Sequence, residues 1–106
     1  MNLPNLSPEK TTSTLAFTDT FNQHKINRFR RQESFRKENL NRFLNLTKRE
    51  VEVLSLVVND YNNPQIATHL FISRKTVEQH RKNIYRKLRI NTIPQLFQYA
   101  LAFDLI

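Results

Sequence analysis

Glycine is absent from all 106 residues of the chain, although soluble domains use it at about 7% of positions. The glycine-rich loops that hold nucleotide phosphates and dinucleotides are therefore excluded. Tight turns that need a positive φ must fall to Asn or Asp, the next most tolerant residue types. Such residues stand where we expect helices to end or begin: Asn45, Asn59, Asp60, Asn62, Asn63 and Asn91.

Cysteine is absent as well, which excludes a disulfide framework and a thiolate metal site and suits a reducing cytoplasm. The longest apolar runs, such as residues 54–58, are far too short to span a bilayer. No basic patch followed by an apolar stretch marks the N-terminus, so we expect neither a signal peptide nor contact with a membrane.

The three histidines, His24, His69 and His80, are too far apart for metal-ligand spacing. Carboxylates are sparse, and no pair of them marks a pocket. We therefore expect no enzyme, no metal and no cofactor. His69 should be exposed on a helix, and His80 should lie at the edge of the core with a local hydrogen bond.

Positive charge is in excess, with 17 Lys and Arg against 9 Asp and Glu and a net charge of +8. This balance favours an anionic partner, most often nucleic acid. The excess is concentrated in residues 74–89, which hold seven basic residues and one acidic residue.

Prolines and a stretch rich in Ser and Thr mark the start of the chain, so residues 1–18 are expected to form a disordered or extended tail. Residues 19–44 contain no proline, and an imperfect apolar stripe predicts a helix with a candidate break near residues 32–34. The stripe consists of Phe21, Ile26, Phe29, Phe35, Leu40, Phe43 and Leu44. Its aromatic residues need a surface to cover, on the C-terminal domain or on a second chain. A truncated linker, a coiled dimerisation arm and a small regulatory helix all fit residues 19–44.

Residues 45–106 carry four helix-start signals. Thr47 is followed three residues later by Glu50, the pattern of a capping box, and Leu46 and Val51 flank it as a hydrophobic staple. Further starts follow at Asn62 or Asn63, at Ser73, and at Asn91 or Thr92. Four short helices without period-two alternation predict an all-α fold, a four-helix domain preceded by a partly helical N-terminal segment.

The second and third expected helices, at about 64–70 and 74–89, are separated by a short turn through Phe71 and Ile72. Ala67 is small, as required where two helices cross closely, and Ile72 places an apolar residue in the turn. This arrangement is typical of a helix-turn-helix motif, whose second helix enters the major groove of DNA.

The helix that starts at Arg74 has two distinct faces. At about 100° per residue, Arg81, Ile84 and Leu88 fall within roughly 40° of Val77, so this face should pack on the core. The opposite side and its edge collect polar residues: Lys75, Glu78, Gln79, Lys82, Asn83 and Arg86. Lys and Arg suit phosphates, while amides, Lys and Glu suit base edges.

Four stretches resemble the LuxR-type (GerE-type) DNA-binding domain across about residues 45–106: TKREVEVL (47–54), QIA (65–67), LFISRKTVEQH (70–80) and KL (87–88). The resemblance implies a four-helix domain whose third helix reads the major groove and whose fourth commonly mediates dimerisation. Where the family usually has glycine after its first helix, this chain has Asp60. Ile93-Pro94 stands where the fourth helix often opens with a basic residue, and Phe103-Asp104 replaces a glycine near the end.

Carried over by position, the resemblance implies base contacts by Glu78, Gln79, Lys82 and Asn83. Phosphate contacts are expected from Arg74, Lys75, Thr76 and Arg86. A dimer interface is expected on the last helix, at Leu96, Phe97, Ala100 and Phe103, assisted by residues 19–44. The chain is thus predicted to be a bacterial transcription regulator, a homodimer on an inverted repeat in duplex DNA, with RNA polymerase as a second candidate partner.

Two other functions fit parts of the sequence. A promoter-reading module of a sigma factor uses a related turn motif, but residues 76–80 and the fourth helix look more like LuxR-type proteins. A protein-interaction adaptor could place the same basic face on an acidic partner, and steep salt-dependent binding to duplex DNA would distinguish the regulator from it.

Overall fold

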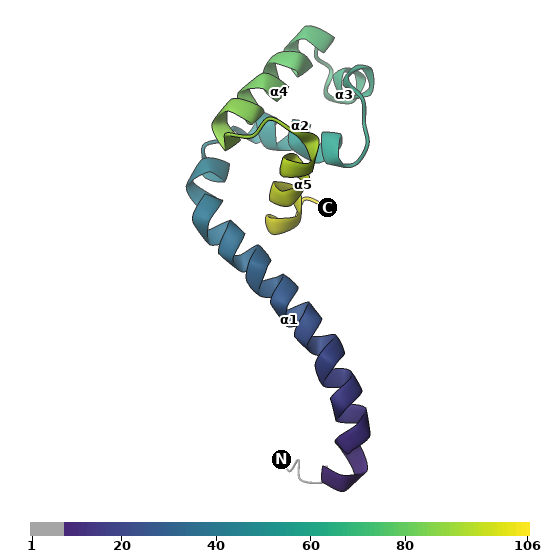
Figure 1. Ribbon diagram of the computed structural model, residues 1–106. Helices are drawn as coiled ribbons and strands as arrows, with labels where there is room; N and C mark the ends of the chain where they lie inside the picture. Colours follow the sequence, from purple (N-terminus) through teal and green to yellow (C-terminus); the bar gives the residue numbers. More distant parts are fainter. Residues whose placement is uncertain (1–7) are drawn as a thin grey trace, which may run out of the picture. The chain divides into compact units, whose positions relative to one another are not determined.

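The computed structural model describes residues 8–106, with side chains from residue 22 onwards. Five helices follow one another in this part of the chain, and it contains no strand (Figure 1): α1 (Pro8–Leu44), α2 (Lys48–Val58), α3 (Asn63–Leu70), α4 (Arg74–Leu88) and α5 (Ile93–Ala102). The predicted all-α fold is confirmed.

The chain divides into two compact units, and the first ends at Gln32. From residue 8 onwards this unit is helical, and it exposes Ile26 and Phe29 to solvent. The predicted extended tail is therefore wrong for residues 8–18, while residues 1–7 lie outside the described part. Pro8 is the first helical residue. Proline is tolerated there because the N–H groups of the first helical turn have no partner within the helix. The candidate break near residues 32–34 does not occur, because α1 is continuous there.

The second unit, Glu33–Ile106, has one hydrophobic core. Its most deeply buried side chains come from α2 to α5: Val53, Leu54, Ile66, Val77, Ile84, Leu88, Leu96 and Tyr99. The last turns of α1 pack on this core, since Phe35 meets the Tyr99 ring edge-on at 4.9 Å and Phe43 stacks on Phe103 at 4.1 Å. The compact unit thus begins ahead of the predicted boundary at residue 45, and these α1 aromatics cover the chain's own domain.

Each helix of α2–α5 begins at a side-chain cap. Thr47 Oγ1 accepts from the Glu50 N–H at 3.1 Å, and the Glu50 carboxylate accepts from the Thr47 N–H at 2.8 Å, so the predicted capping box is confirmed. Asn62 forms a second box that starts α3, Ser73 caps α4, and Thr92 starts α5. Each cap satisfies backbone N–H groups that a helix start leaves without an intrahelical partner.

Helices α2–α5 end in the same way, with one residue in the left-handed conformation. The next N–H then reaches back to the carbonyl oxygen five positions earlier, which is the closing bond of a Schellman motif. The left-handed residues are Asp60, Phe71, Arg89 and Asp104, with φ of 75°, 57°, 55° and 58°. The closing bonds, of 2.8–3.0 Å, run from Tyr61 to Leu56, Ile72 to Ala67, Ile90 to Tyr85 and Leu105 to Ala100.

One of these four residues, Asp60, is among the Asn and Asp residues expected in tight turns. Asp104 was not named among them, although Asp is one of the residue types expected there. Phe71 and Arg89 are left-handed as well, which the rule favouring Asn and Asp did not predict. A left-handed residue with a Cβ costs about 1–2 kcal/mol. The conformation persists at these two positions because the closing bond satisfies a helix-end carbonyl and the packing of α3 and α4 fixes where each helix stops.

We predict that Arg89→Gly stabilises the domain relative to Arg89→Ala. Both variants remove the same exposed side chain, but only glycine removes the steric cost of the left-handed backbone. The free energy of unfolding, from urea denaturation followed by circular dichroism, should be higher for the glycine variant by about 1 kcal/mol. Equal stability of the two variants would show that position 89 carries no such strain.

Candidate nucleic-acid interface

Helix α4 lies with one face fully in the core. Val77, Ile84 and Leu88 are 0%, 1% and 0% exposed, as the helical angles predicted. Helix α3 packs beside α4, with Ala67 buried between helices and Ile72 in the turn packed against the core. The helix-turn-helix arrangement is therefore present, and the opposite face of α4 is turned to solvent.

Two polar contacts fix α4 at separate points along its length. Arg81 donates to Asn63 Oδ1, at the start of α3, at 3.0 Å. Lys87, in the last turn, donates to Glu50 Oε1, near the start of α2, at 2.7 Å. The second contact is an ion pair whose carboxylate side chain is 4% exposed and whose ammonium side chain is 23% exposed. Together with the core, these contacts prevent α4 from rotating about its axis.

Glu50 is both a cap and a partner of Lys87, and this double role sets its charge state. Burial by itself raises the pKa of the Glu50 carboxyl, because burial disfavours the charged form. The hydrogen bond and charge of Lys87, together with the bonds to Thr47, lower it by more, so the pKa lies below its ordinary value. The carboxylate is therefore the form that the fold stabilises.

The outward face of α4 brings together the residues predicted to contact bases. Glu78, Gln79 and Lys82 are exposed, and Asn83 is half-buried among them. Gln79 Nε2 donates to Asn83 Oδ1 at 3.2 Å, and Arg86 donates to the same oxygen at 3.4 Å. Amide and guanidinium groups thus form a row along the helix, and hydrogen bonds connect Gln79 and Arg86 to Asn83.

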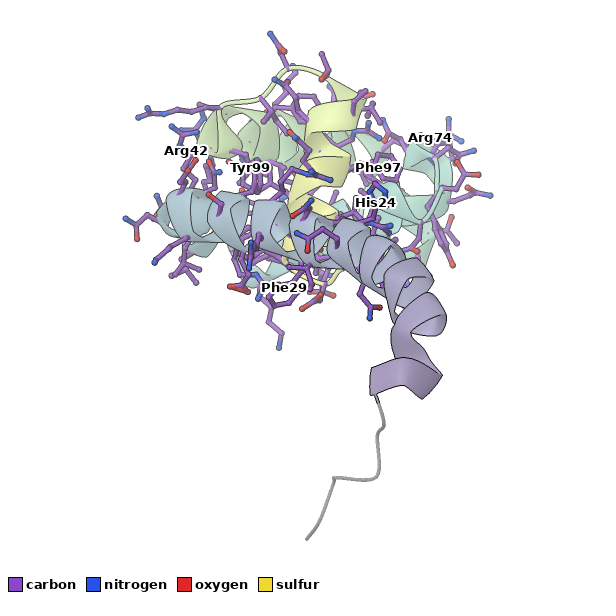
Figure 2. The ribbon with its side chains drawn as sticks, turned by 60° about the horizontal axis from the view of Figure 1, so that its bottom comes forward. His24, Phe29, Arg42, Arg74, Phe97 and Tyr99 are labelled. Carbon is purple, nitrogen blue, oxygen red and sulfur yellow. The ribbon has the colours of Figure 1, made fainter. Side chains whose placement is uncertain are left out.

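The first turn of α4 carries Arg74, Lys75 and Thr76, all exposed (Arg74 is labelled in Figure 2). Thr76 Oγ1 lies 2.8 Å from the hydroxyl of the capping Ser73. None of Arg74, Lys75, Lys82 or Arg86 forms an ion pair with a residue that the structure describes. The cations of this face are therefore available for an external anion.

Comparison with known proteins assigns this arrangement to a family. Residues 44–100 match the family model of bacterial regulatory proteins, luxR family. The chain belongs to the luxR family. Oxygen regulatory protein NreC of Staphylococcus carnosus (strain TM300) is 46% identical over 61 residues, which cover 58% of this chain and 28% of the relative. The protein of the same name from Staphylococcus aureus (strain JH9) gives the same identity and coverage.

This chain therefore matches little more than a quarter of the length of those relatives. The match confirms the predicted resemblance and the predicted helix-turn-helix domain, and it falls on α2, α3, α4 and most of α5. The luxR family consists of DNA-binding regulators rather than enzymes.

Helix α5 of this luxR domain corrects the predicted dimer residues. Leu96 and Ala100 are 1% and 0% exposed and belong to the core, so they are not available to a second chain. Phe103 is half-buried and stacks on Phe43, and Phe97 is half-buried (labelled in Figure 2). Three of the four predicted residues lie on the inward face of the helix, because apolar residues occur on both sides of α5 and its packing on α2 decides which side is inward.

The structure also reveals contacts between α1 and α5 that sequence reasoning missed. The hydroxyl of buried Tyr99 lies 3.1 Å from Asn39 Oδ1 and 3.2 Å from the carbonyl oxygen of Leu88, and can donate its proton to either (Tyr99 is labelled in Figure 2). Arg36 Nε donates to the carbonyl oxygen of Ala102 at 2.6 Å. The apolar stripe that includes Phe35 and Phe43 was the available signal, but it did not identify these polar partners.

The histidines take no part in a cluster of ligands. In residues whose side chains are described, no three of His, Cys, Asp and Glu gather as a metal site. His69 is exposed, as predicted, and its ring meets Tyr61 edge-on at 5.6 Å. His80 lies at the edge of the core, but its buried Nδ1 lacks the expected hydrogen-bond partner. No described helix is long and apolar enough to cross a membrane.

We predict that the Glu50 contacts make stability pH-dependent. A carboxyl whose pKa is lowered by folding contributes stability above its unfolded pKa of about 4.3, and that stability is lost as the pH falls through the lower folded value. Urea denaturation at a series of pH values should therefore show Glu50→Gln destabilised at pH 7 but approaching the wild type in acid. Glu52→Gln removes an exposed carboxylate from the same helix and is the control. A constant difference between wild type and Glu50→Gln from pH 7 to about pH 3 would contradict this account.

Proposed function

We propose that this chain regulates transcription by binding a specific site in duplex DNA, with the outward face of α4 in the major groove. One observation carries the proposal. One face of α4 is fully buried, and on its opposite, polar face no Lys or Arg side chain forms an ion pair with a described residue. A helix that is fixed in the core and cationic outside matches the recognition helix of a helix-turn-helix protein. Membership of the luxR family supports the same function.

The hydrogen bonds along α4 indicate which base edges suit its amides. Asn83 Oδ1 already accepts from Gln79 and Arg86, so its Nδ2 group is left as a donor for an acceptor such as purine N7. Gln79 uses Nε2 in that contact and keeps Oε1 as an acceptor, which suits the amino groups of adenine or cytosine. Lys82 supplies a donor for guanine O6 or N7, and Glu78 an acceptor for cytosine N4.

Phosphate contacts are assigned to Arg74, Lys75 and Thr76 in the first turn, and to Arg86 near the end of the helix. The first three lie at the N-terminus of α4, where backbone N–H groups and the helix dipole also favour an anion. Such contacts fix the position of the helix in the groove without reading sequence. RNA polymerase is the second proposed partner, because a regulator at a promoter acts on the enzyme that initiates there.

We further propose that two copies pair through the outward face of α5. At helical spacing, Phe97 and Leu101 share this face, and Ile93 flanks it. Ile93 and Leu101 are 39% and 49% exposed, whereas Phe97 is half-buried. A two-fold dimer would present its α4 helices about 34 Å apart and require an inverted-repeat site.

Binding to DNA should depend steeply on salt and on Lys82. If about six phosphates are contacted, log affinity should fall with log salt at a slope near −5. Lys82→Ala should cost roughly 1–3 kcal/mol on a duplex selected from random sequences and little on random duplex. Arg86→Ala, the matched loss of one cation, should weaken both duplexes equally. A slope near zero for the wild type, measured by fluorescence anisotropy, would exclude the proposed function.

Dimerisation should be lost in Leu101→Glu. The side chain is half exposed in the single chain, so folding should survive while a buried charge at the interface disfavours pairing. Sedimentation of the full chain should then give the monomer mass at concentrations where the wild type is dimeric. Leu44→Glu places the same charge at the exposed end of α1 and separates the two candidate surfaces. A dimer that persists in Leu101→Glu but dissociates in Leu44→Glu would place the interface on α1 instead.

A further inference from the structure

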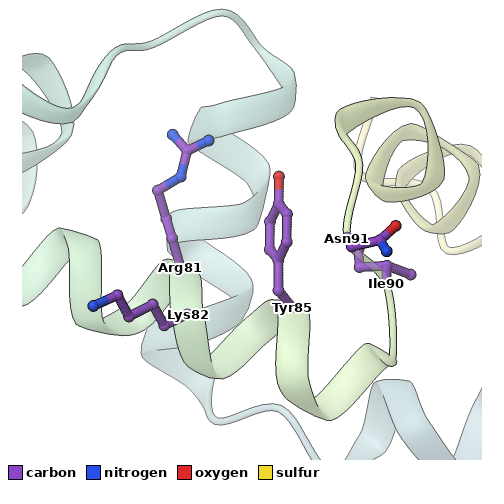
Figure 3. A pocket seen from close by; sticks show the side chains of 5 residues that line it. All are labelled: Arg81, Lys82, Tyr85, Ile90 and Asn91. Carbon is purple, nitrogen blue, oxygen red and sulfur yellow. The ribbon is translucent and has the colours of Figure 1, made fainter.

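A hollow of about 480 Å³ opens beside α4, next to the face assigned to base contacts. It is lined by Arg81, Lys82 and Tyr85 from the helix and by Ile90 and Asn91 from the segment that follows (Figure 3). Arg81 and Tyr85 project together from neighbouring turns of the helix, and Asn91 faces them across the opening. Neither the capping of α4 nor the assigned base and phosphate contacts account for Arg81, Tyr85 and Asn91 together.

The chemistry of this hollow suits a phosphate group. Its lining offers a guanidinium, an ammonium, a phenol hydroxyl and an amide, all of which can donate hydrogen bonds. No acidic residue lines it, and neither Arg81 nor Lys82 forms an ion pair within the described part of the chain. Ile90 forms an apolar wall that packs on the core. The phosphates are the anionic groups of a nucleic acid, and arginine and lysine side chains commonly bind them.

Arg81 is held in place rather than free to move. Its bond to Asn63 Oδ1 at 3.0 Å restrains the guanidinium, and its side chain is partly buried. Arginine carries several N–H donors, so one bond to Asn63 leaves others for an anion. A restrained donor loses less conformational entropy on binding than a free one.

The hollow lies on the side of α4 that would face one wall of the DNA major groove. At about 100° per residue, Tyr85 lies about 80° and Arg81 about 40° from Val77. The residues assigned to base contacts are centred near 180°, from about 100° at Glu78 to about 240° at Asn83. The major groove is about 12 Å wide and a helix with its side chains about 10–12 Å across. Side chains on the flank of an inserted helix therefore meet the backbone of the adjacent strand and not the bases.

We propose that Arg81, Tyr85 and Asn91 bind a backbone phosphate of duplex DNA in this hollow, on one wall of the groove that α4 enters. The proposal rests on the proposed DNA-binding function and extends the contact surface past the recognition helix to the segment between α4 and α5. One phosphate per domain is bound, by charge from Arg81 and by hydrogen bonds from Tyr85 and Asn91. The contact carries no sequence information.

The test combines protein variants with duplexes in which single phosphates are replaced by neutral methylphosphonates. Tyr85→Phe should weaken binding about tenfold, equally on selected and random duplex. Arg81→Gln should make the salt slope shallower by about 1. One methylphosphonate per half-site should weaken the wild type but cause no further loss in Tyr85→Phe. Tyr61→Phe, which removes a phenol hydroxyl from the turn before α3, is the matched control and should bind like the wild type.

Three outcomes would overturn the proposal. If Tyr85→Phe and Arg81→Gln bind like the wild type while Lys82→Ala weakens binding, the hollow takes no phosphate although DNA binding stands. If Asn63→Ala, which keeps the charge of Arg81, reproduces the whole effect of Arg81→Gln including the shallower salt slope, Arg81 acts only by fixing α3 to α4. If inorganic phosphate alone binds the hollow but no methylphosphonate position depends on Tyr85, the site takes a free anion. If DNA binding by the wild-type protein does not depend on salt, the proposed function itself is wrong.

Discussion

The carboxylate of Glu50 joins two parts of the domain that are distant in sequence. It accepts the Thr47 N–H that starts α2 and the Lys87 ammonium in the last turn of α4, at 2.8 and 2.7 Å. The carboxylate is almost fully buried while the Lys87 side chain is 23% exposed, so removing Lys87 would leave a buried charge with only the Thr47 N–H as a partner. This ion pair and the core contacts of Val77, Ile84 and Leu88 fix the rotation of α4. Which residues of α4 face outward depends on that rotation.

The neighbouring contacts extend this restraint along and around α4. Arg81 connects the middle of the helix to the start of α3, and the Tyr99 hydroxyl lies within hydrogen-bonding distance of the Leu88 carbonyl at its end. Tyr99 also lies within hydrogen-bonding distance of Asn39, so the last turns of α1 belong to the same packed unit. The outward face of α4 therefore belongs to a helix that is held by contacts at several points, the arrangement that the proposed reading of bases would require.

Local patterns in the sequence were enough to predict much of this fold. Thr47 with Glu50 predicted a helix start because a cap involves residues only three positions apart. The start at Asn62 or Asn63 was predicted as well, and the structure places the cap on Asn62. The spacing of Val77, Ile84 and Leu88 predicted the buried face of α4, since a helix repeats at a known angle. The outward position of Glu78, Gln79 and Lys82 follows from the same angle, and the structure shows all three exposed.

The features that sequence reasoning missed depend on contacts between distant residues. Nothing local to Glu50 or Lys87 shows that they meet, and the cap role of Glu50 gave no reason to seek a second partner. Leu96 was placed at a dimer interface, but α5 is apolar on two sides, and its packing on α2 decides which side is buried. The left-handed Arg89 was also missed, because the place where α4 stops is set by tertiary packing and not by the preference of one residue.

The outward face of α4 is proposed to enter the major groove of duplex DNA. A nuclear magnetic resonance titration of the full chain with a selected duplex tests this most directly. We expect intermolecular contacts between the side chains of Gln79 and Lys82 and protons at the major-groove edges of bases. Shift changes should be largest on α4 and at its first turn. Contacts confined to α5 or to α2, with the Gln79 and Lys82 signals unchanged at saturation, would contradict it.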